Sequence, residues 1–581
     1  MNINPVGMCT LQKVEWNLFL TVSSFSMWPI RGNSKEVVAT QEQLIERLLA
    51  NRGVDAVHAE SFFSPSYLSS IHNPYDMPGM QMAVEVVMRA VKNKERIMVY
   101  GDYDADGITS TAIMLDVLES IGAHAVPYLP HRYHDGYGLN GDVLQSASSE
   151  FDVLITVDCG IGNADVVAML RNLGKDVIIV DHHELPETIP NATAILHPRY
   201  PDGAYGWGHL CGAGTSWKFA QALLRHEDSG YAKDPDKEKW LLDLAMIGTI
   251  ADVMPLLGEN RSIVTFGKEV LMRTKRPGLL ALIKQARIEP SVMTAKDIAF
   301  RIIPLINAAG RIGHPQSALN ALIAKTPEQA QLAVKELISL NNERRSMTKK
   351  IMDDAIDSVD PALPFVFAVN KDWHAGIVGL VAGRLASKFG KPAFVLGGLP
   401  DMNTHAVGSA RGAGNTNVLH ALETVRHHTL KLGGHAGAAG FSVMHESVKY
   451  MKDGLVEYFS SKSADSVPVD HNADGILDPR LITWETVQAL KQFEPFGEQN
   501  PEPTFIIQNA QAYDVRTIGS SGDHLKMRLS FGDKDVEAIG FGLAEKADIA
   551  EKPMNILATL GINEFRGRQT LEVRILDISS K

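Results

Sequence analysis

The stretch Arg96–Gly107, RIMVYGDYDADG, decides how the first half of this 581-residue chain folds. It begins with a short apolar run, and a turn that carries three aspartates follows at once. Two similar runs come later, at Asp152–Val157 (DVLITV) and Asp176–Val180 (DVIIV), and polar residues again follow each one. Helix-like segments at Thr111–Ile121 and Ala164–Leu173 lie between the runs. Strands that alternate with helices in this way predict a parallel sheet covered on both faces.

The aspartates of the first turn, Asp102, Asp104 and Asp106, stand at alternate positions. Their carboxylates would repel one another strongly unless a cation lies among them. Hard ions such as Mg²⁺ or Mn²⁺ prefer oxygen ligands of this kind. A calcium loop is one alternative, but an apolar helix follows and no glutamate stands at the twelfth position. A solvated acidic turn is the other alternative, and the metal site is the interpretation that the spacing favours.

Further ligand-type residues follow the other predicted strands. Asp158 comes after the second strand, Asp181-His182-His183 after the third, and Asp252 lies in an apolar segment. Each has a simpler explanation, since a lone aspartate at a strand end is often only a helix cap. Their joint placement favours one site, because open parallel sheets bind ligands at the carboxyl ends of their strands. So many ligands suit two bridged metal ions, which activate water and stabilise a leaving oxygen in phosphoryl chemistry.

The composition is that of a globular protein with several domains. Hydrophobic residues make up 45% of the chain and charged residues 21%, both ordinary values. No apolar run reaches the roughly 20 residues of a spanning helix, and no signal peptide is recognisable. Cys9, Cys159 and Cys211 are few, odd in number and without metal-site spacing. We therefore expect a cytoplasmic protein without membrane segments rather than a disulfide scaffold.

The net charge of −12 does not exclude a polyanionic substrate, because binding depends on local patches. Between Arg261 and Arg301 there are nine Lys and Arg residues against three Asp and Glu residues. A second basic cluster consists of Arg344, Arg345, Lys349 and Lys350. Solvated helix faces explain either cluster equally well. Charge alone therefore leaves nucleic acid open as a ligand.

The second half of the chain predicts two more structural units. A long helix should run from Thr326 to about Val359, with Thr326 as its cap, Pro327 at its first position and Gln329 completing a capping box. Phe365–Val369 begins a second α/β region that extends to about residue 460. From about residue 465, apolar and polar residues alternate, as in Leu525–Phe531 and Leu571–Ile575. Alternation with period two indicates half-buried antiparallel strands and so a small β-barrel.

Glycine-rich turns in the second α/β region could bind an anion. They are Trp373–Gly379, Gly408–Gly412 and Gly433–Gly440. Glycines let backbone N–H groups approach an anion, and an arginine such as Arg411 can grip a phosphate through two hydrogen bonds. Such turns more often serve packing than binding, so they are weak evidence alone.

Taken in order and context, these residues resemble a known family. Asp102–Gly107, Asp158, Asp181–His183 and Asp252 resemble the four motifs of the DHH phosphoesterases. The rest of the chain resembles the RecJ branch, the bacterial single-strand-specific 5′→3′ DNA exonucleases. The stretches that carry this second resemblance are Pro130–Leu139, Asn307–Arg311, Trp373-His374, Gly408–Arg411, Gly433–Gly440 and Phe496–Pro503. The similarity covers roughly residues 45 to 581.

The resemblance implies an α/β fold in which a parallel-sheet DHH domain and a smaller α/β DHHA1 domain are joined by a long helix. A C-terminal OB-fold β-barrel follows. The implied limits are 46–325 for the DHH domain, 326–360 for the connecting helix, 361–464 for the DHHA1 domain and 465–581 for the OB-fold. Residues 1–45 form an N-terminal extension that matches nothing in the family.

The resemblance also assigns roles to residues. Two Mn²⁺ or Mg²⁺ ions would be held by Asp102, Asp104, Asp106, Asp158, His182 and Asp252. Asp104, Asp158 and His183 would be catalytic, with His183 on the scissile phosphate. The substrate would be bound by Arg311, His374, Ser409, Arg411, Gly434 and His435. The chain would act as a monomer on single-stranded DNA in repair and recombination, with a single-strand-binding protein and a helicase as partners.

One departure from the family pattern concerns substrate binding. The family has arginine where this chain has Leu305, within Pro304-Leu305-Ile306, and Arg301 is a candidate replacement. Two other functions stay open. A DHH phosphodiesterase for cyclic dinucleotides or very short oligonucleotides would share the metal site but lack the C-terminal β domain, as would a manganese pyrophosphatase. A non-catalytic DNA-binding scaffold would have lost metal ligands, and here every ligand position is filled.

Overall fold

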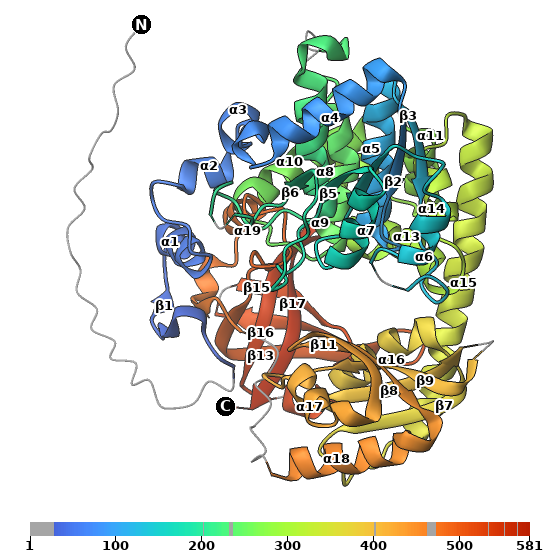
Figure 1. The fold of residues 1–581 in the computed structure, drawn as a ribbon. Coiled ribbons are helices and arrows are strands. Elements are labelled where there is room, and N and C mark those ends of the chain that lie inside the picture. The colour runs from blue at the N-terminus through green and yellow to red at the C-terminus, as the bar shows by residue number, and fades with distance from the viewer. Residues whose placement is uncertain are drawn as a thin grey trace, which may run out of the picture.

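The structure of the 581-residue chain is a computed structural model. The structure describes residues 28–580 except 137, 202, 232–235, 400–401, 462–471, 533, 551 and 566. The described residues form two five-stranded sheets and one seven-stranded sheet (Figure 1).

The first sheet is fully parallel, as the sequence predicts. Its strand order is β3-β2-β4-β5-β6, with β2 at Arg96–Tyr100, β3 at His124–Tyr128, β4 at Val153–Val157, β5 at Asp176–Val180 and β6 at Ala194–Leu196. Side chains of β2 alternate between two cores. Ile97 and Val99 join the larger core, whereas Met98 and Tyr100 face the smaller one. The sheet is therefore covered on both faces, which explains its near-continuous apolar strands.

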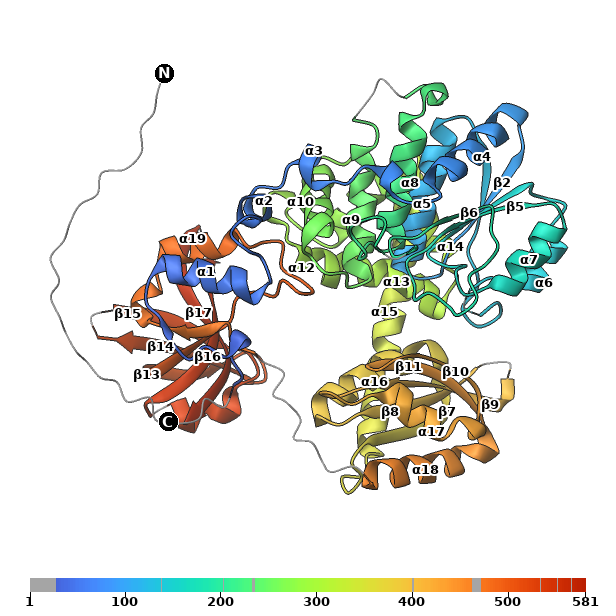
Figure 2. The same cartoon turned by 60° about the vertical axis from the view of Figure 1, so that its left-hand side comes forward.

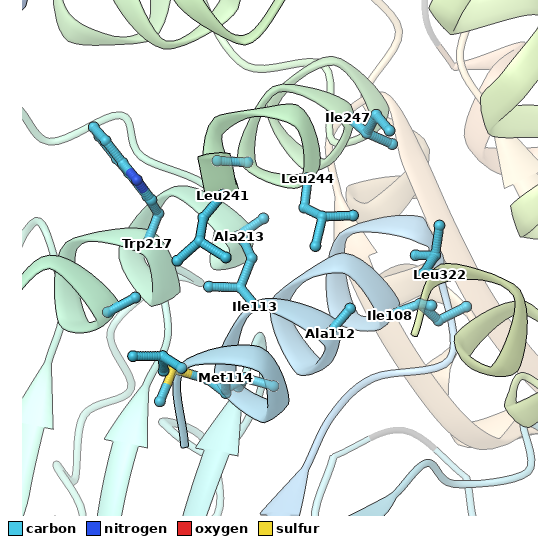
Figure 3. Close-up of a cluster of buried hydrophobic side chains, with 14 of the residues drawn as sticks. Ile108, Ala112, Ile113, Met114, Ala213, Trp217, Leu241, Leu244, Ile247 and Leu322 are labelled. Atoms are coloured by element: carbon cyan, nitrogen blue, oxygen red, sulfur yellow. The ribbon is translucent and has the colours of Figure 1, made fainter. Parts of the chain in front are cut away.

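Helices that precede or follow the strands in the sequence form the two layers that cover the faces of this sheet. Helices α6 (Gly141–Ser146) and α7 (Ala164–Asn172) cover the smaller core. The larger core is formed by α4 (Met80–Asn93), α5 (Ala105–Ser120), α8 (Gly212–Arg225) and α9 (Leu242–Ala251). Figure 3 shows Ile113 of α5 beside Ala213 of α8, with Trp217 of α8, Leu244 of α9 and Ile108 of α5 in the same cluster. All five side chains are fully buried. This packing fixes the start of α5, which begins at the acidic turn.

Further helices extend the larger core: α10 (Gly258–Met272), α11 (Pro277–Gln285), α13 (Ile303–Ile312) and α14 (Gln316–Leu322). The short helix α12 (Ala295–Asp297) precedes α13 and buries none of its residues. The long helix α15, Pro327–Asp357, then leads to the second sheet (Figures 1 and 2). Thr326 caps α15 by accepting a hydrogen bond from Gln329 N. The Gln329 side chain, however, accepts from Lys325 N and not from the cap residue, so the predicted capping box is wrong.

The second sheet is mixed and has the order β10-β11-β9-β8-β7. Its strands are β7 (Val366–His374), β8 (Ala393–Leu399), β9 (Met402–Arg411), β10 (Thr429–His435) and β11 (Ala438–Met444). Only β7 and β8 are parallel. Helices α16 (Ala375–Phe389), α17 (Val418–Thr424) and α18 (Val448–Ser460) pack against it. The helix α16 starts directly where β7 ends, so His374 lies at the junction.

The third sheet contains a closed five-stranded barrel, which confirms the predicted OB-type β-barrel. Pairing of β13 with both β14 and β16 closes the ring β13-β14-β15-β17-β16. These strands are β13 (Phe505–Ile518), β14 (His524–Phe531), β15 (Lys534–Gly540), β16 (Met554–Phe565) and β17 (Arg568–Ser580). The short β12 (Gly475–Leu477) and helices α19 (Trp484–Lys491) and α20 (Ala547–Ala550) complete this unit. Leu525, Met527 and Leu529 are buried at the predicted alternate positions.

The N-terminal segment packs on this barrel. Strand β1 (Val37–Val38) pairs with β12, and Leu44 and Leu48 of helix α1 (Gln41–Asn51) are buried in the barrel core. Figures 1 and 2 show α1, in blue, beside the red strands of the barrel. The short helices α2 (Ala59–Phe63) and α3 (Tyr67–Ser70) then lead to the first domain. The part of the predicted extension beyond residue 27 is thus integrated into the fold, and residues 1–27 lie outside the described part.

Arg261 of α10 joins the first domain to the barrel unit. Its buried guanidinium donates to the carbonyl oxygens of Phe62, Gln492, Phe493 and Glu494, at 2.7 to 3.1 Å. It also lies 3.8 Å from the centroid of the Phe62 ring. Burial is the main cause that lowers its pKa to about 10. Removing either the buried charge or the carbonyl groups that accept from it is costly, because the remaining polar groups lose their partners.

We predict that Arg261→Ala lowers the free energy of unfolding by about 3 kcal/mol, because four carbonyl groups lose their donor and two of these hydrogen bonds are buried. Urea unfolding followed by circular dichroism measures this change. Arg273→Ala, at the exposed end of the same helix, is the matched control and should change stability by less than about 0.5 kcal/mol. Equal effects of the two substitutions would show that Arg261 does not join the domains.

Candidate metal centre

The carboxyl ends of β2, β4 and β5 carry the predicted ligands at one edge of the sheet. The turn after β2 contains Asp102, Asp104 and Asp106, Asp158 follows β4, and Asp181-His182-His183 follows β5. Asp158 has a φ of 60°, in the left-handed region that aspartate tolerates better than most residues. The fourth segment is the end of α9, where Asp252 is the C-cap.

Two helix N-termini meet the acidic turn. Asp104 caps α5, and its Oδ1 accepts hydrogen bonds from the backbone N atoms of Asp106 and Gly107, at 2.9 and 3.2 Å. The Asp106 carboxylate accepts from Gly212 N and Ala213 N, at 2.7 and 2.9 Å. Those two amides belong to the first turn of α8, where a helix favours negative charge. The backbone thus holds the Asp106 side chain in one orientation.

Glycines allow the close approach of these segments. A Cβ atom on Gly212 would lie 2.5 Å from the Cβ of Asp158, and one on Gly248 would lie 2.5 Å from Oδ1 of Asp106. Neither contact is sterically possible, so α8 and α9 reach the carboxylates only without side chains at these positions.

His182 lies among three of the carboxylates. Its Nε2 atom is 3.1 Å from Oδ1 of Asp158, 3.5 Å from Oδ2 of Asp252 and 3.8 Å from Oδ2 of Asp106. Burial, and then the charge of His183, lower the pKa of His182 to about 3. The imidazole is therefore neutral near pH 7, which is the form that binds metal ions.

His183 is held in the opposite protonation state. Burial favours its neutral form, but the hydrogen bond and charge of Asp181 outweigh burial and raise its pKa to about 9. The Nδ1 atom of His183 lies 2.7 Å from Oδ1 of Asp181. Asp181 is buried and also accepts from the backbone N atoms of Ile161, His182 and His183. His183 thus presents a positive charge at the site.

The remaining carboxylates repel one another. Burial and the charge of Asp104 raise the pKa of Asp102 to about 8 and that of Asp106 to about 6. Burial and the charge of Asp106 raise the pKa of Asp252 to about 8, and they raise that of Asp158 well above its usual value. Negative charge is therefore concentrated here beyond what the protein itself balances.

Two orphaned oxygen atoms show that the residues fit a bound cation. Oδ1 of Asp102 and Oδ2 of Asp252 are buried without a hydrogen-bond partner in the described residues. Three groups have possible ligand atoms that all lie within 4.8 Å of one another: Asp102, Asp104 and Asp158; Asp106, His182 and Asp252; and Asp158, His182 and His183. Carboxylate oxygens with one or two imidazoles suit Mn²⁺ or Mg²⁺. The predicted ligands are thus brought together in space.

A polar cavity of about 270 Å³ opens beside the acidic turn. It is lined by Asp102, Tyr103, Asp104, Arg132, His183, Ala251, Asn307, Gly310 and Arg311. Sequence reasoning did not single out Arg132 or Asn307. Arg132 stacks over the Tyr103 ring at 4.8 Å, and Asn307 Oδ1 accepts from Ala105 N at 2.9 Å. Both lie in stretches that carry the resemblance, Pro130–Leu139 and Asn307–Arg311, which was the available signal.

Some predicted substrate-binding residues lie near this cavity. The carbonyl of Arg311, on the cavity wall, accepts from the Tyr133 hydroxyl at 3.1 Å. The Tyr133 ring lies 5.6 Å from that of His374, which caps α16. A Cβ on Gly376 would lie 2.1 Å from both the Arg311 carbonyl and the Tyr133 hydroxyl. The second domain therefore contacts the first at Gly376, in the first turn of α16, where the absence of a side chain allows the close approach.

The other predicted substrate-binding residues lie on the second sheet. Ser409 Oγ accepts from the Arg411 guanidinium at 2.8 Å. Burial, and then the charge of Arg132, lower the pKa of Arg411, so these two arginines are within electrostatic range across the domains. Gly434 and His435 are on β10, and His435 pairs with Ala438, which in turn pairs with Arg411. They are therefore two strands away from Arg411.

The structure also bears on the departure at position 305. Leu305 is 7% exposed and packs in the large core, so this position does not face the cavity. The Arg301 guanidinium bonds to Asp297 at 3.0 Å and to the carbonyls of Ala286 and Arg287. The Arg301 guanidinium thus binds Asp297 and the turn at Ala286 and Arg287, and it does not replace an arginine of the cavity.

Comparisons with known proteins match this architecture. Models of the DHH family N-terminal domain, the DHHA1 domain and the RecJ OB domain match residues 96–249, 363–461 and 473–577. The single-stranded-DNA-specific exonuclease RecJ of Bacillus subtilis is 34% identical over 96% of this chain and 71% of that protein. The protein of the same description from Escherichia coli is 31% identical over 92% of this chain and 95% of its own length.

Solved structures agree. A crystal structure of RecJ in complex with Mn²⁺ from Thermus thermophilus matches with a TM-score of 0.79 and 28% identity, over 94% of this chain and 77% of that one. A corresponding structure in complex with Mg²⁺ has a TM-score of 0.74 and 27% identity, over 94% of this chain and 76% of that one. These matches confirm the resemblance and the fold class that the motifs predict.

We predict that Asp158→Asn stabilises the metal-free protein at pH 8 by about 1 kcal/mol or more, because it removes one of several mutually repelling buried charges. The raised pKa of Asp158 means that its charged form destabilises the fold, and that this penalty is present at pH 8. Thermal unfolding in a chelator measures the change. Asp165→Asn, exposed on α7, is the control with the same charge change. A lower unfolding temperature for Asp158→Asn than for the control would contradict the repulsion.

We also predict that the affinity for Mn²⁺ rises between pH 6 and pH 8, because protons on Asp102 and Asp252 compete with the ion. The dependence should level off above pH 8, where both carboxyl groups are ionised. Calorimetric titration in two buffers of different ionisation enthalpy would detect the released protons. An affinity that is constant across this range would show that these carboxyl groups do not bind the ion.

Proposed function

The chain belongs to the RecJ family of single-stranded-DNA-specific exonucleases, and we propose on this premise that it removes nucleotides stepwise from the 5′ end of single-stranded DNA. It is a metal-dependent phosphodiester hydrolase that uses Mn²⁺ or Mg²⁺. The observation that carries the chemistry is the orphaned pair of buried carboxylate oxygens on Asp102 and Asp252. Together with the neutral imidazole of His182, these oxygens can bind cations. They therefore favour metal-dependent hydrolysis over acid–base catalysis by side chains alone.

The six predicted ligands would hold two ions: Asp102, Asp104, Asp106, Asp158, His182 and Asp252. When bound, such ions activate water and balance the negative charge that develops on the phosphate. The protein's own contribution is orientation. The α8 amides fix the carboxylate of Asp106, and the contact with Asp158 fixes the ring of His182.

Around the scissile phosphate, the proposed roles fall to three side chains of the cavity wall. His183, kept protonated by Asp181, would donate a hydrogen bond to a phosphate oxygen. Arg132 and Arg311 add positive charge on the same wall. Stabilisation of developing negative charge by groups already in place is usually the largest single effect in such reactions. Arg132 thus joins the predicted site residues as an addition drawn from the geometry.

Substrate binding would extend to the second sheet and the barrel. Ser409, Arg411, His374, Gly434 and His435 are proposed to bind phosphates of the strand. Support comes from the electrostatic range between Arg411 and Arg132, which spans the two domains. The OB-type barrel would hold the strand further along, as such barrels do through stacking and a basic groove. We propose the domain limits given by the resemblance, except that α1 (Gln41–Asn51) belongs with the barrel unit on which it packs.

The cellular setting is also a proposal. A monomer in the cytoplasm that works with a single-strand-binding protein and a helicase follows from the family alone. Among the described residues, no helix has the length and apolar character required to cross a membrane.

A phosphodiesterase for small substrates is the alternative that shares the metal centre. The closed barrel and the match to the RecJ OB domain over residues 473–577 favour a polymer, because a dinucleotide has no use for a strand platform. A non-catalytic scaffold is disfavoured because every ligand position is filled and the side chains converge.

The proposal is tested with single-stranded oligonucleotides labelled at one end or the other. With Mn²⁺, the 5′ label should appear at once in very short products, while the 3′-labelled strand shortens gradually. Blunt duplex should be spared. Asp158→Asn should retain less than about 1% of the activity, because it weakens the binding of the ions, whereas Asp165→Asn should be fully active.

The outcomes separate the alternatives. Gradual shortening of the 5′-labelled strand would reverse the polarity. Hydrolysis of dinucleotides without degradation of longer strands would favour the small-substrate enzyme. Binding of DNA without cleavage by any metal would favour the scaffold.

A further inference from the structure

The crossing of α13, α15 and α16 contains a basic cluster that the proposed function has not used. Gly313, directly after α13, packs against Leu340 of α15, at 3.2 Å between an added Cβ and the leucine Cδ2. The next turn of α15 carries Arg344, so this arginine lies beside the end of α13, where Arg311 is located. Helix α16 packs along α15 through Ile351, Ala355 and Val381. We call Arg344, Arg345 and Arg384 the hinge arginines.

The structure pairs none of the hinge arginines with an acidic side chain among the residues that it describes. In the described part of the chain, none of the three makes an ion pair, and Arg344 donates only to the side-chain oxygen of Asn341 at 3.2 Å. The neighbouring Glu343 interacts electrostatically with His374 instead. Arg344 is half-buried, whereas Arg345 and Arg384 are exposed. Structural arginines in this protein are paired or held by carbonyls, as Arg276 and Arg261 are. The hinge arginines differ from these two in having no such partner among the described residues.

Positive charge is continuous from the metal cavity to this crossing. Burial, followed by the charges of Arg384 and Arg345, lowers the pKa of Arg344. Burial, Arg132 and Arg344 lower the pKa of Arg311, and Arg132 also acts on Arg411. Each arginine is thus within electrostatic range of the next. Asp102 and Asp104 offset this charge at Arg132, and Asp104 does so at Arg311, whereas Arg384 and Arg345 are the charges that act on Arg344. The energetic cost of assembling like charges around Arg344 is recovered when a polyanion neutralises them.

We propose that Arg344 and Arg384 form a second phosphate-binding site at the hinge between the two α/β domains, beyond the cavity that contains Arg132 and Arg311. The site takes nucleotide phosphates. Two sources share this chemistry: the phosphates of a bound single strand, and the phosphate of the nucleotide released by cleavage. The inference rests on the proposed exonuclease function, since it assigns the ligand as part of that substrate or product.

Because the site lies where the two domains join, a bound phosphate would contact elements of both. Arg344 belongs to the helix that joins the domains, and Arg384 belongs to the first helix of the second domain. One phosphate bound by both would neutralise charge on the two elements together. The contact would therefore add to strand or product affinity without any direct contact with the metal ligands.

The first arm of the test measures strand binding in the inactive Asp158→Asn protein, so that DNA is not degraded. Fluorescence anisotropy with a labelled oligothymidylate is recorded at several salt concentrations. Arg344→Ala/Arg384→Ala should lower the slope of log K against log salt by about 0.7 for each phosphate that the variant no longer binds. The matched control is Lys349→Ala/Lys350→Ala, which removes the same charge from exposed positions of α15.

The second arm measures inhibition of the active enzyme by thymidine 5′-monophosphate. If the site holds the released nucleotide, the arginine variant should need several-fold more monophosphate for half inhibition, while its salt slope matches the control. If the site holds the strand, the salt slope falls. Either result supports the phosphate site.

A salt slope and an inhibition constant that both equal those of the lysine control would overturn the inference. Thermal unfolding of each variant checks that the fold is intact, and Arg345→Ala/Arg384→Ala serves as a second variant if the first is unstable. Failure of the exonuclease proposal is seen separately, because it requires that the wild-type protein does not degrade single strands with Mn²⁺.

Discussion

Repulsion among buried carboxylates is the constraint on which the rest of this structure depends. Asp102, Asp106, Asp158 and Asp252 come from three separate segments, and burial together with the charge of neighbouring carboxylates raises the pKa of each. A chain gains nothing in stability from such a cluster. The large hydrophobic core beneath it must therefore hold the segments in place against their repulsion. The packing of α5 against α8 and α9 supplies that hold at the point where the acidic turn begins.

The same constraint explains where this chain avoids side chains. Gly212 and Gly248 allow α8 and α9 to reach Asp158 and Asp106, and an added Cβ at either position would overlap a neighbour. Gly376 likewise allows α16 of the second domain to approach the carbonyl of Arg311. These glycines are needed for close approach and not for turns, which sequence alone could not distinguish. A glycine-rich stretch such as Gly408–Gly412 looks the same in the sequence whether it packs or binds.

Prediction from the sequence succeeded where the signal was local. The three apolar runs became β2, β4 and β5, and the ligand-type residues that follow them lie together because parallel strands share one carboxyl edge. Non-local features could not be found in this way. Val37 and Val38 pair with residues more than 400 positions away, so nothing near them indicates a strand on the barrel. Arg132 and Asn307 lie in stretches that carry the resemblance, but nothing in the sequence indicates that folding brings them to one cavity wall. The capping box failed for a smaller reason, since Gln329 can reach two successive amides and bonds the earlier one.

One carboxylate, that of Asp181, sets opposite protonation states in the two neighbouring histidines His182 and His183. Asp181 is buried, and its hydrogen bond to Nδ1 of His183 keeps that ring protonated. The resulting positive charge, together with burial, keeps His182 neutral. A neutral ring can join the carboxylates as a ligand, whereas a protonated ring cannot bind a cation but can donate to a phosphate. Asp181 contributes no ligand atom to the three candidate metal groups, and its three backbone hydrogen bonds hold it in place as a support. The division of labour between the two rings therefore originates one residue before them, in a carboxylate that is fully satisfied by the protein itself.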